Sequence, residues 1–445
     1  MLKKIKTLVS PTNPVRLFWH RLKELLARVY FRNPSNKLIV IGITGTNGKT
    51  TTTTLTAKIL EKAGYKVGMA STTGFKIDRM EWQNTTHKTT LAPFYLYKLL
   101  WKMVKAGCDY AVIETSSHAL SQHRVSGINY DVVCITNVSP EHLDYHKSMK
   151  AYRRVKMKLF KMLTNGKRKK GVKKISIHNA DDTENFDEFM KFPSDKKIAY
   201  GRQITDAQGI DEQVRADDVE LFPDHSCLTI HTPKETKKIK TYLPGDFNIE
   251  NILAATAIAY SHGVSLKAVS DACKELRLVP GRMESINEGQ DYKVFIDFAM
   301  TEDGYQKLLS ALRKITEKDL WVVFGCCGDR DRKKRPKIGE ICGELADKVI
   351  ICDDEPYTED PKVIREMILE GIRNTKMEEG KDYFVIPDRA EAIKFACQHA
   401  KTGDTIVVPG MGDLEGRTFA DGIRPWSDRE EVRKALKNVK EELKQ

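Results

Sequence analysis

A glycine-rich segment ending in lysine and threonine follows the first strand-like run of the sequence. The run Leu38 to Ile43 leads directly into Thr44-Gly-Thr-Asn-Gly-Lys49-Thr50, and a helical stretch begins at Leu55. Such a turn points backbone N–H groups and the positive end of a helix at one place, where Lys49 adds a full charge. The spacing is G-x-x-G-K-T, shorter than the usual G-x-x-x-x-G-K-[ST]. It predicts a cradle for a nucleoside triphosphate, formed by Gly45, Thr46, Asn47, Gly48, Lys49, Thr50 and Thr51.

A magnesium ion bound to the phosphates and to the Thr50 hydroxyl needs one or two further hard oxygen or imidazole ligands. Glu114 is the best candidate, because it ends the strand-like run Tyr110 to Ile113 at the sheet edge where nucleotides bind. The next strand-like run is followed by Thr136-Asn137 and then by Glu141-His142-Leu-Asp-Tyr-His146. A functional role for this cluster is at least as well supported as the alternative, in which its side chains are simply exposed to solvent in a loop.

Short β-branched runs alternate with helical stretches from Lys37 onward, as expected for strands buried on both faces of a parallel sheet. Residues 196–243 have shorter, alternating patterns that favour antiparallel hairpins, and two helices are predicted over 248–262 and 265–276. The Pro and Gly of Leu278-Val-Pro-Gly-Arg282 mark a domain junction. Beyond it the alternation resumes, which predicts a second open, mostly parallel sheet.

The sequence therefore predicts an α/β protein of three parts. Residues 1–36 form a basic amphipathic extension, residues 37–278 a central P-loop-type ATPase domain with a mostly parallel sheet, and residues 279–445 a C-terminal Rossmann-like α/β domain. In the extension, apolar residues recur at helical spacing between Val15 and Val29, with arginine and lysine between them. We favour packing of this 13–32 helix on the body of the protein. Association with an anionic membrane surface is the alternative, since both need the same pattern.

The composition excludes several classes of protein. The 445 residues include 74 Lys+Arg and 61 Asp+Glu, a net charge of +13, and these charges are spread among apolar segments, unlike those of a disordered polymer. No apolar run is long enough to span a membrane or to direct export, so we expect a cytoplasmic protein. Dispersed basic residues without interleaved aromatic residues favour an anionic small substrate over nucleic acid. Nine cysteines without a Cys-x-x-Cys pair favour reduced thiols over disulfides or zinc.

The order of the motifs resembles that of the Mur ligases, ATP-dependent amide-forming enzymes of peptidoglycan precursor synthesis in cell-wall biogenesis, and most closely the MurE type. The resemblance runs from about Val40 to the C-terminus. The phosphate loop alone is a weak signal, whereas the ordered set is a strong one. The set comprises Thr44-Gly-Thr-Asn-Gly-Lys-Thr50, Glu114-Thr-Ser-Ser-His-Ala-Leu-Ser-Gln-His-Arg124, Thr136-Asn137 with His142-Leu-Asp-Tyr-His146, Asn179-Ala-Asp-Asp182, Gly245-Asp-Phe-Asn-Ile-Glu-Asn251, Val279-Pro-Gly-Arg-Met-Glu284 and Phe324-Gly-Cys-Cys-Gly-Asp-Arg-Asp331.

This resemblance implies a reaction in which ATP phosphorylates the carboxylate of a UDP-N-acetylmuramoyl-dipeptide and the amine of a free amino acid displaces phosphate to form an amide. It implies catalytic roles for Lys49, His142, Lys156 and Arg282. It implies Mg²⁺ ligation by Thr50, Glu114, His142 and Lys156, the last after carbamylation by CO₂. Nucleotide contacts are implied for Asn137, Asn248, Asn251, Arg282 and Asp297. Substrate contacts are implied for Thr89, Thr90, Ser116, Gln122, Arg124, Asp354 and Asp413. We expect a monomer.

Departures from the family pattern concern the two substrates. Family members carry a separate N-terminal domain for the uridine end, whereas 36 residues precede the central domain here, so the 13–32 helix is a candidate replacement. Met300 stands where the family has histidine, Tyr357 where diaminopimelate-adding members have arginine, and Asp413 ends a segment that is usually Lys-Gly-His-Glu. Tyrosine does not replace a bidentate arginine. We therefore expect an altered amino-acid pocket in which Glu355 and Asp413 favour a cationic side chain.

Two other functions stay open. Folylpolyglutamate synthases share the central and last domains and also lack the uridine-binding domain, but the Ser-Ser-His and His-Leu-Asp-Tyr-His strings favour the muramoyl type. A non-catalytic nucleotide-binding scaffold would explain the replacements at Met300, Tyr357 and Asp413. A decayed enzyme would be expected to lose some of the residues that carry the chemistry, yet all of them are present.

Overall fold

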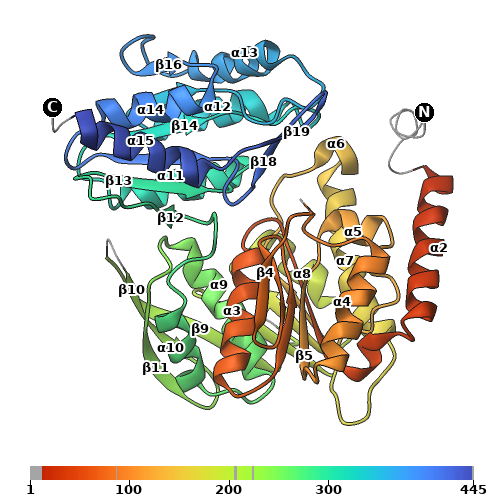
Figure 1. Ribbon diagram of the computed structural model, residues 1–445. Coiled ribbons are helices and arrows are strands. Elements are labelled where there is room, and N and C mark those ends of the chain that lie inside the picture. The colour runs from red at the N-terminus through yellow and green to blue at the C-terminus, as the bar shows by residue number, and fades with distance from the viewer. Residues whose placement is uncertain (1–12, 87, 205–207, 223–224, 443–445) are drawn as a thin grey trace. The chain divides into compact units, whose positions relative to one another are not determined.

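The computed structural model describes residues 13–86, 88–204, 208–222 and 225–442, and the chain divides into two compact units (Figure 1). The first unit comprises the chain up to Ser139, Tyr145–Leu243 and Phe247–Arg277. The second comprises Pro140–Asp144, Pro244–Asp246 and the chain from Leu278 onward. Among the described residues, no helix has the length and apolar character needed to cross a membrane.

The first unit is built on one sheet, which among the described residues has 11 strands in the order β11-β10-β9-β8-β7-β6-β1-β5-β2-β3-β4. Its middle part, from β9 to β2, is parallel, which confirms the predicted sheet. The strands are β1 (Ile39–Thr44), β2 (Val67–Ala70), β3 (Gly74–Ile77), β4 (Met80–Gln83), β5 (Tyr110–Glu114), β6 (Val132–Ile135), β7 (Ile175–Asn179), β8 (Lys196–Gly201), β9 (Glu212–Leu221), β10 (Ser226–His231) and β11 (Thr236–Thr241).

The prediction of antiparallel hairpins over 196–243 is wrong for the first strand of that region, β8. β8 pairs in parallel with β7 and β9, and only β9, β10 and β11 form the antiparallel meander. The physical reason is burial, because Ile198, Ala199 and Tyr200 are all buried and β8 therefore continues the two-sided core of the parallel sheet. The alternating pattern belongs to β10, where buried and half-buried residues alternate.

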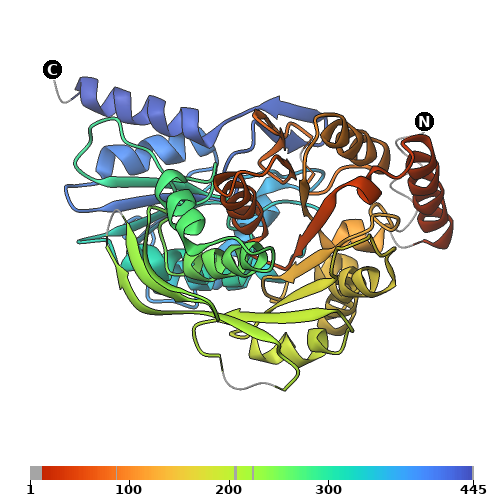
Figure 2. The ribbon, with the colours of Figure 1, turned by 90° about the horizontal axis from the view of Figure 1, so that it is seen from below.

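Helices cover both faces of this sheet. On one face α3, α9 and α10 pack together, and Figure 2 shows α3 beside the two green helices. On the other face Val40, Ala111 and Val133 share a hydrophobic core with α4, α5, α7 and α8, while α2 packs on α4. The helices are α2 (Pro14–Tyr30), the 3₁₀ helix η1 (Pro34–Lys37), α3 (Lys49–Lys62), α4 (Pro93–Lys105), α5 (Ser117–Ser121), α6 (Leu143–His146), α7 (Met149–Asn165), α8 (Thr183–Met190), α9 (Phe247–Tyr260) and α10 (Leu266–Glu275).

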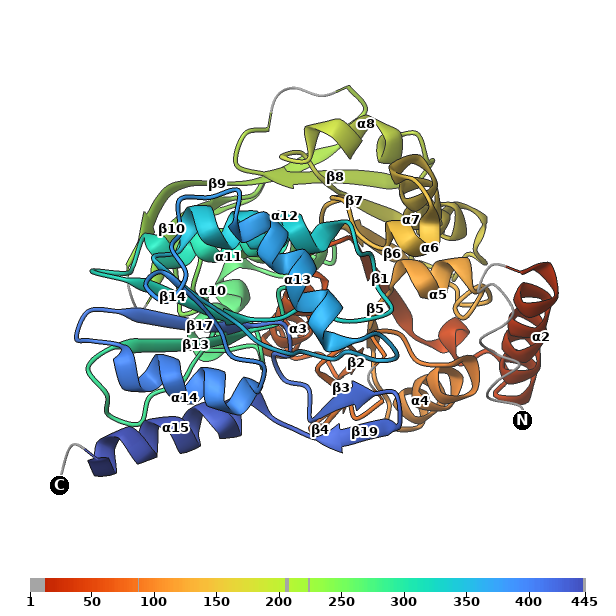
Figure 3. The same ribbon diagram turned by 90° about the horizontal axis from the view of Figure 1, so that it is seen from above.

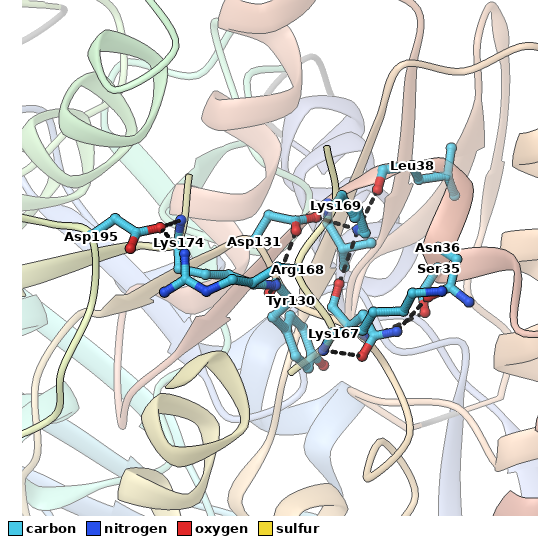
Figure 4. Close-up of polar contacts among 12 residues, drawn as sticks. Ser35, Asn36, Leu38, Tyr130, Asp131, Lys167, Arg168, Lys169, Lys174 and Asp195 are labelled. Atoms are coloured by element: carbon cyan, nitrogen blue, oxygen red, sulfur yellow. Dashed lines mark hydrogen bonds and ion pairs between the residues drawn. The ribbon is translucent and has the colours of Figure 1, made fainter. Parts of the chain in front are cut away.

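A buried ionic cluster joins the amino ends of β1, β6 and β7 (Figure 4). Asp131 is fully buried and accepts hydrogen bonds from the Lys169 ammonium, from Lys174 Nζ at 3.1 Å and from the Val40 backbone N–H at 2.9 Å. Lys169 also donates to the Leu38 carbonyl at 2.6 Å, and Lys174 to the Tyr130 carbonyl. Because each buried charge has partners, the cluster holds three strand ends in register at the edge opposite the phosphate loop.

The second unit contains a sheet in the order β12-β13-β17-β14-β15-β16 among the described residues, parallel except for β12. This confirms the second, mostly parallel sheet. Its elements are β12 (Glu284–Ser285), β13 (Lys293–Asp297), α11 (Glu302–Arg313), β14 (Leu320–Phe324), α12 (Lys334–Leu345), β15 (Lys348–Ile351), α13 (Pro361–Ile372), β16 (Tyr383–Val385), α14 (Arg389–His399), β17 (Thr405–Pro409), the hairpin β18 (Gly416–Phe419) and β19 (Gly422–Pro425), and α15 (Asp428–Glu442).

Candidate active site

The phosphate loop lies between β1 and α3, as predicted. Gly48 is the N-cap of α3 with a φ of +83°, and glycine has no side chain that could accept a hydrogen bond from the first turn of this helix. The first-turn N–H groups therefore face outward at the positive end of the helix dipole. Lys49 Nζ donates a hydrogen bond to the Thr46 carbonyl at 2.6 Å, so its ammonium lies over the loop. This combination of amides and one cation suits a polyphosphate.

Neighbouring side chains enclose the loop and hold its shape. The Thr46 N–H donates to the Asn137 carbonyl at 2.8 Å, and the Asn47 N–H donates to Asn137 Oδ1 at 2.9 Å. A Cβ at Gly48 would lie 2.2 Å from Asn251 Oδ1. Asn251 Nδ2 in turn donates to Asn248 Oδ1 at 2.9 Å. Asn137 and Asn251 thus border the loop directly, Asn248 is hydrogen-bonded to Asn251, and only glycine fits at position 48.

Glu114 and Thr50 come together beside the loop. Glu114 ends β5, is 1% exposed, and accepts hydrogen bonds from Thr50 Oγ1 at 3.1 and 3.2 Å. Thr72, in the turn after β2, donates to the same carboxylate through its N–H at 2.8 Å and its hydroxyl at 3.0 Å. The register β1–β5 brings Ile43 opposite Glu114, which is why the two motifs meet. A carboxylate and a hydroxyl next to a phosphate cradle are the hard oxygen donors that suit Mg²⁺.

Lys156 reaches the back of the phosphate loop from α7. It is 1% exposed, donates to the Gly45 carbonyl at 2.6 Å, and lies 4.2 Å from the centre of the Tyr152 ring. The neighbouring Lys158 on the same helix is half-buried. Lys156 is therefore held at the loop, and it is not the solvated helix lysine that its charged neighbours in sequence would suggest.

Four of the predicted substrate residues form one hydrogen-bonded network. Thr90 Oγ1 donates to the Glu114 carbonyl at 2.9 Å and to Ser116 Oγ at 3.2 Å. Arg124 donates to the Thr90 carbonyl at 3.1 Å and to Gln122 Oε1. Burial lowers the pKa of Arg124 from its ordinary value. Thr89, half-buried, precedes this network in the chain. Because the network begins at Glu114, which contacts Thr50 of the phosphate loop, it adjoins the predicted nucleotide site.

The remaining predicted residues belong to the second unit. Asp297 ends β13 and accepts from the Met283 and Ala299 N–H groups, each at 2.7 Å, and burial raises its pKa. Arg282 stacks on Phe298 at 4.5 Å. Burial raises the pKa of Asp413 to about 6, an effect that nearby Arg282 opposes.

Asp354 follows β15 and lies deep in the second unit. It is 3% exposed, and burial raises its pKa to about 6. The guanidinium of Arg417 donates to its backbone carbonyl at 2.8 and 3.0 Å, and a Cβ at Gly410 would lie 2.9 Å from its carboxylate. Glu355 accepts from the Thr418 N–H at 3.0 Å. Two buried carboxylates therefore follow one strand of this sheet.

His142 is the predicted metal ligand that the first unit does not contain. It lies in the segment Pro140–Asp144 of the second unit, with Nε2 3.4 Å from Glu141 Oε1. Within the described parts of the chain, no three His, Cys, Asp or Glu side chains gather as a complete metal site. That is compatible with Mg²⁺, which is bound through one or two protein ligands together with substrate phosphates.

Two residues of the site were not predicted from the sequence. Thr72 makes two hydrogen bonds to Glu114, and Tyr152 lies against Lys156. The sequence carries one signal for Thr72, because the hydroxyl-rich segment Ser71-Thr-Thr73 follows a short apolar strand. Tyr152 precedes Lys156 by one helical turn, which places both side chains on one face of α7.

Comparisons with known proteins agree with this geometry. A model described as Mur ligase middle domain matches residues 43–259, and one described as Mur ligase, glutamate ligase domain matches residues 281–412. The UDP-N-acetylmuramyl-tripeptide synthetase of Roseiflexus sp. (strain RS-1) is 37% identical over 416 residues, which cover 92% of this chain and 81% of the relative.

Solved structures give the same result. The structure of a UDP-N-acetylmuramoyl-L-alanyl-D-glutamate--2,6-diaminopimelate ligase matches with a TM-score of 0.61 and 29% identity, over 95% of this chain and 83% of that chain. E. coli FolC in complex with ADP matches with a TM-score of 0.66 at 18% identity, over 96% and 94% of the two chains, and this likeness concerns the fold alone. With both domains matched in order and a relative alike along most of its length, the chain belongs to the Mur ligase family.

Proposed function

We propose that this chain catalyses ATP-dependent amide bond formation, adding one amino acid to a UDP-N-acetylmuramoyl-dipeptide in peptidoglycan precursor synthesis. The observation that carries the proposal is the contact of Thr50 with Glu114 at 3.1 Å beside a phosphate loop. A relative named UDP-N-acetylmuramyl-tripeptide synthetase resembles the chain over 416 residues. The E. coli FolC likeness, at 18% identity, extends to the fold and gives the folate alternative no further support.

The chemistry requires two displacement steps. In the first, a carboxylate oxygen of the peptide attacks the γ-phosphorus of ATP, the bond to the bridging oxygen breaks, and ADP leaves. In the second, the amine of the amino acid attacks the acyl carbon, inorganic phosphate leaves with the bonding electrons, and the amine loses a proton. The Lys49 ammonium and the first-turn amides of α3 would neutralise phosphate oxygens as negative charge moves toward ADP.

Glu114 and Thr50 would hold Mg²⁺, with His142 as the further ligand expected from the family resemblance. When bound, the ion neutralises phosphate charge. The role of this chain's own residues is to keep the two oxygens in place, and Thr72 does so by donating two hydrogen bonds to the Glu114 carboxylate. Arg282, Asp297, Asn248 and Asn251 are proposed to contact the nucleotide.

Lys156 is proposed to carry a carbamate. Its ammonium would first lose a proton, and the resulting amine would attack CO₂ and lose a second proton, so that a buried cation becomes a carboxylate-like anion. The support is its burial and its position against the Gly45 carbonyl on the phosphate loop. An anion there would add a hard oxygen donor beside the Thr50 and Glu114 pair, whereas an ammonium could ligate nothing.

The network of Thr90, Ser116, Gln122 and Arg124 is proposed to hold the UDP-muramoyl-peptide. Its support is continuity with Glu114, because Thr90 donates to the Glu114 carbonyl. The half-buried guanidinium of Arg124 suits a carboxylate or phosphate of the substrate.

The amino acid added is proposed to have a cationic side chain. The support is the pair of buried carboxylates Asp354 and Glu355 after β15, together with Asp413, in a unit where Tyr357 stands in place of an arginine. A distal ammonium would compensate these charges, whereas the distal carboxylate of diaminopimelate would be repelled.

Phosphate release from ATP tests the function. We expect release with UDP-N-acetylmuramoyl-dipeptide plus an amino acid, and a higher kcat/KM for lysine than for diaminopimelate. Release only with folate plus glutamate would favour the folate alternative, and release under no pairing would favour the scaffold. Equal turnover of lysine and diaminopimelate would contradict the cationic pocket while leaving the ligase function intact, and Glu355→Gln should remove the preference.

Lys156→Ala tests the carbamate. Activity should fall, and added formate or acetate should restore part of it, because a small carboxylate can occupy the vacated position. Lys158→Ala, two residues along the same helix, is the matched control and should stay active. Full activity of Lys156→Ala would contradict the carbamate role.

A further inference from the structure

The N-terminal helix α2 packs on the first unit with its polar side inward. Its buried residues are Glu24 and Ala27, and the Glu24 carboxylate accepts a hydrogen bond from Tyr97 Oη on α4 at 2.5 Å. The large apolar side chains point away from the unit, with Val15, Phe18, Trp19, Leu26 and Val29 51–74% exposed. This orientation differs from the expected one, since the helix does pack on the body but not through its apolar face.

The exposed apolar surface continues onto α4. Phe94 and Trp101 of that helix are 43% and 40% exposed, and Trp101 lies 6.5 Å from the ring of Phe31, which follows α2. Figures 1 and 3 both show α2 at the outer margin of the first unit, with α4 on its inner side. Exposed apolar side chains of the two adjacent helices are therefore joined through the rings of Tyr30, Phe31 and Trp101, and clustered apolar side chains of this kind mark an interaction surface.

The exposed charges of these two helices have one sign. The two helices contain seven basic residues, four arginines and lysines on α2 and three lysines on α4, against one acidic residue, the buried Glu24. Lys23 lies 5.9 Å from the Trp19 ring and Lys105 lies 5.6 Å from the Trp101 ring. Long basic side chains beside aromatic rings can reach a polar headgroup while their apolar stems stay with the rings.

We propose that the outward face of α2, with the adjoining face of α4, docks on the surface of an anionic phospholipid bilayer. The helix would lie in the plane of the interface, with Phe18, Trp19 and Leu26 among the acyl chains and the basic residues at the phosphates. A face that binds a protein partner of mixed charge would carry exposed acidic as well as basic residues, and these two helices have no exposed acidic residue. Aromatic side chains together with cations and without exposed acids match the apolar boundary and negative potential of such a membrane.

Flotation of the full chain with lipid vesicles tests this proposal. We expect binding to vesicles of phosphatidylcholine with about 30 mol% phosphatidylglycerol and little binding to phosphatidylcholine alone. Trp19→Ser with Leu26→Ser should lower the bound fraction at least about tenfold. The matched control is Val363→Ser with Ile423→Ser, which removes two apolar side chains of similar exposure, 48% and 60%, from the second unit.

Charge-reversal variants distinguish specific docking on anionic lipid from non-specific adsorption to vesicles. Arg21→Glu with Lys23→Glu should abolish binding to the anionic vesicles, whereas Lys234→Glu with Lys237→Glu on the β10–β11 hairpin should not. Unchanged ADP binding and circular dichroism would show that each variant is folded. The proposal fails if the chain does not bind anionic vesicles, if it binds both vesicle types equally, or if the Trp19 and Leu26 variant binds as well as the parent. It also fails if sedimentation shows a dimer that this variant abolishes, because the face would then be occupied by a second copy.

Discussion

Two glycines at opposite ends of α3 give a controlled test of the phosphate loop. Gly48 precedes the helix with φ +83° and Gly64 follows it with φ +91°. Substitution of either by alanine forces a left-handed backbone that costs about 1–2 kcal/mol. They differ in their surroundings, because a Cβ at 64 meets nothing within 4 Å, whereas one at 48 lies 2.2 Å from Asn251 Oδ1.

The contact at position 48 determines the size of the effect. Ordinary contact begins at 3.4 Å, so the loop and Asn251 must separate by 3.4 − 2.2 = 1.2 Å. That shift redirects the first-turn amides of α3 away from the phosphates. Losing one charge-assisted hydrogen bond costs about 1.5–3 kcal/mol, which corresponds to a Kd about 10- to 150-fold higher.

Isothermal titration with Mg²⁺-ADP measures this difference. Gly48→Ala should bind ADP at least about tenfold more weakly than the parent, while Gly64→Ala should bind it normally and lose only thermal stability. Equal ADP affinities of the two variants would refute the argument, since both carry the same backbone cost and only the approach to Asn251 distinguishes them.

Three further predictions concern buried charges. Asp131→Ala leaves two buried ammonium groups without their carboxylate and should destabilise the first unit by about 3–5 kcal/mol, measured by hydrogen exchange in β1 and β6; Glu220→Ala, which breaks an exposed pair, should leave that exchange unchanged. Because burial raises the pKa of Asp354 from 3.8 to about 6, the folded state binds its proton more tightly, and stability should fall by up to about 3 kcal/mol as pH rises from 4 to 6. In Asp354→Asn the pH dependence of urea unfolding should be correspondingly flatter, and an unchanged slope would contradict the assignment. Arg124→Lys should raise KM for the UDP-muramoyl-dipeptide about tenfold with little change in kcat, because lysine cannot reach Gln122 and the substrate together, and a normal KM would remove Arg124 from that site.

Much of the site could be predicted because its residues lie at strand ends. Gly45 to Thr50 follow β1 and Glu114 ends β5, and parallel neighbours bring their carboxyl ends to one edge. Thr72 was not predicted because β2 is short and nothing in the local sequence shows that β2 pairs with β5. For Lys156 the sequence offered only the family resemblance, since helical periodicity does not show what a lysine on α7 faces.

The sequence by itself determined the order of elements, the phosphate loop and the helical character of residues 14–30, because local spacing dictates backbone conformation. It could not determine which side of that helix faces the protein. The amphipathic pattern favours burial of the apolar side, and only the tertiary structure, through the hydrogen bond from Tyr97 to Glu24, turned that side outward. Parallel pairing of β8 with β9 was likewise decided by packing, since burial on both faces of the sheet is a property of the assembled layers and not of one strand.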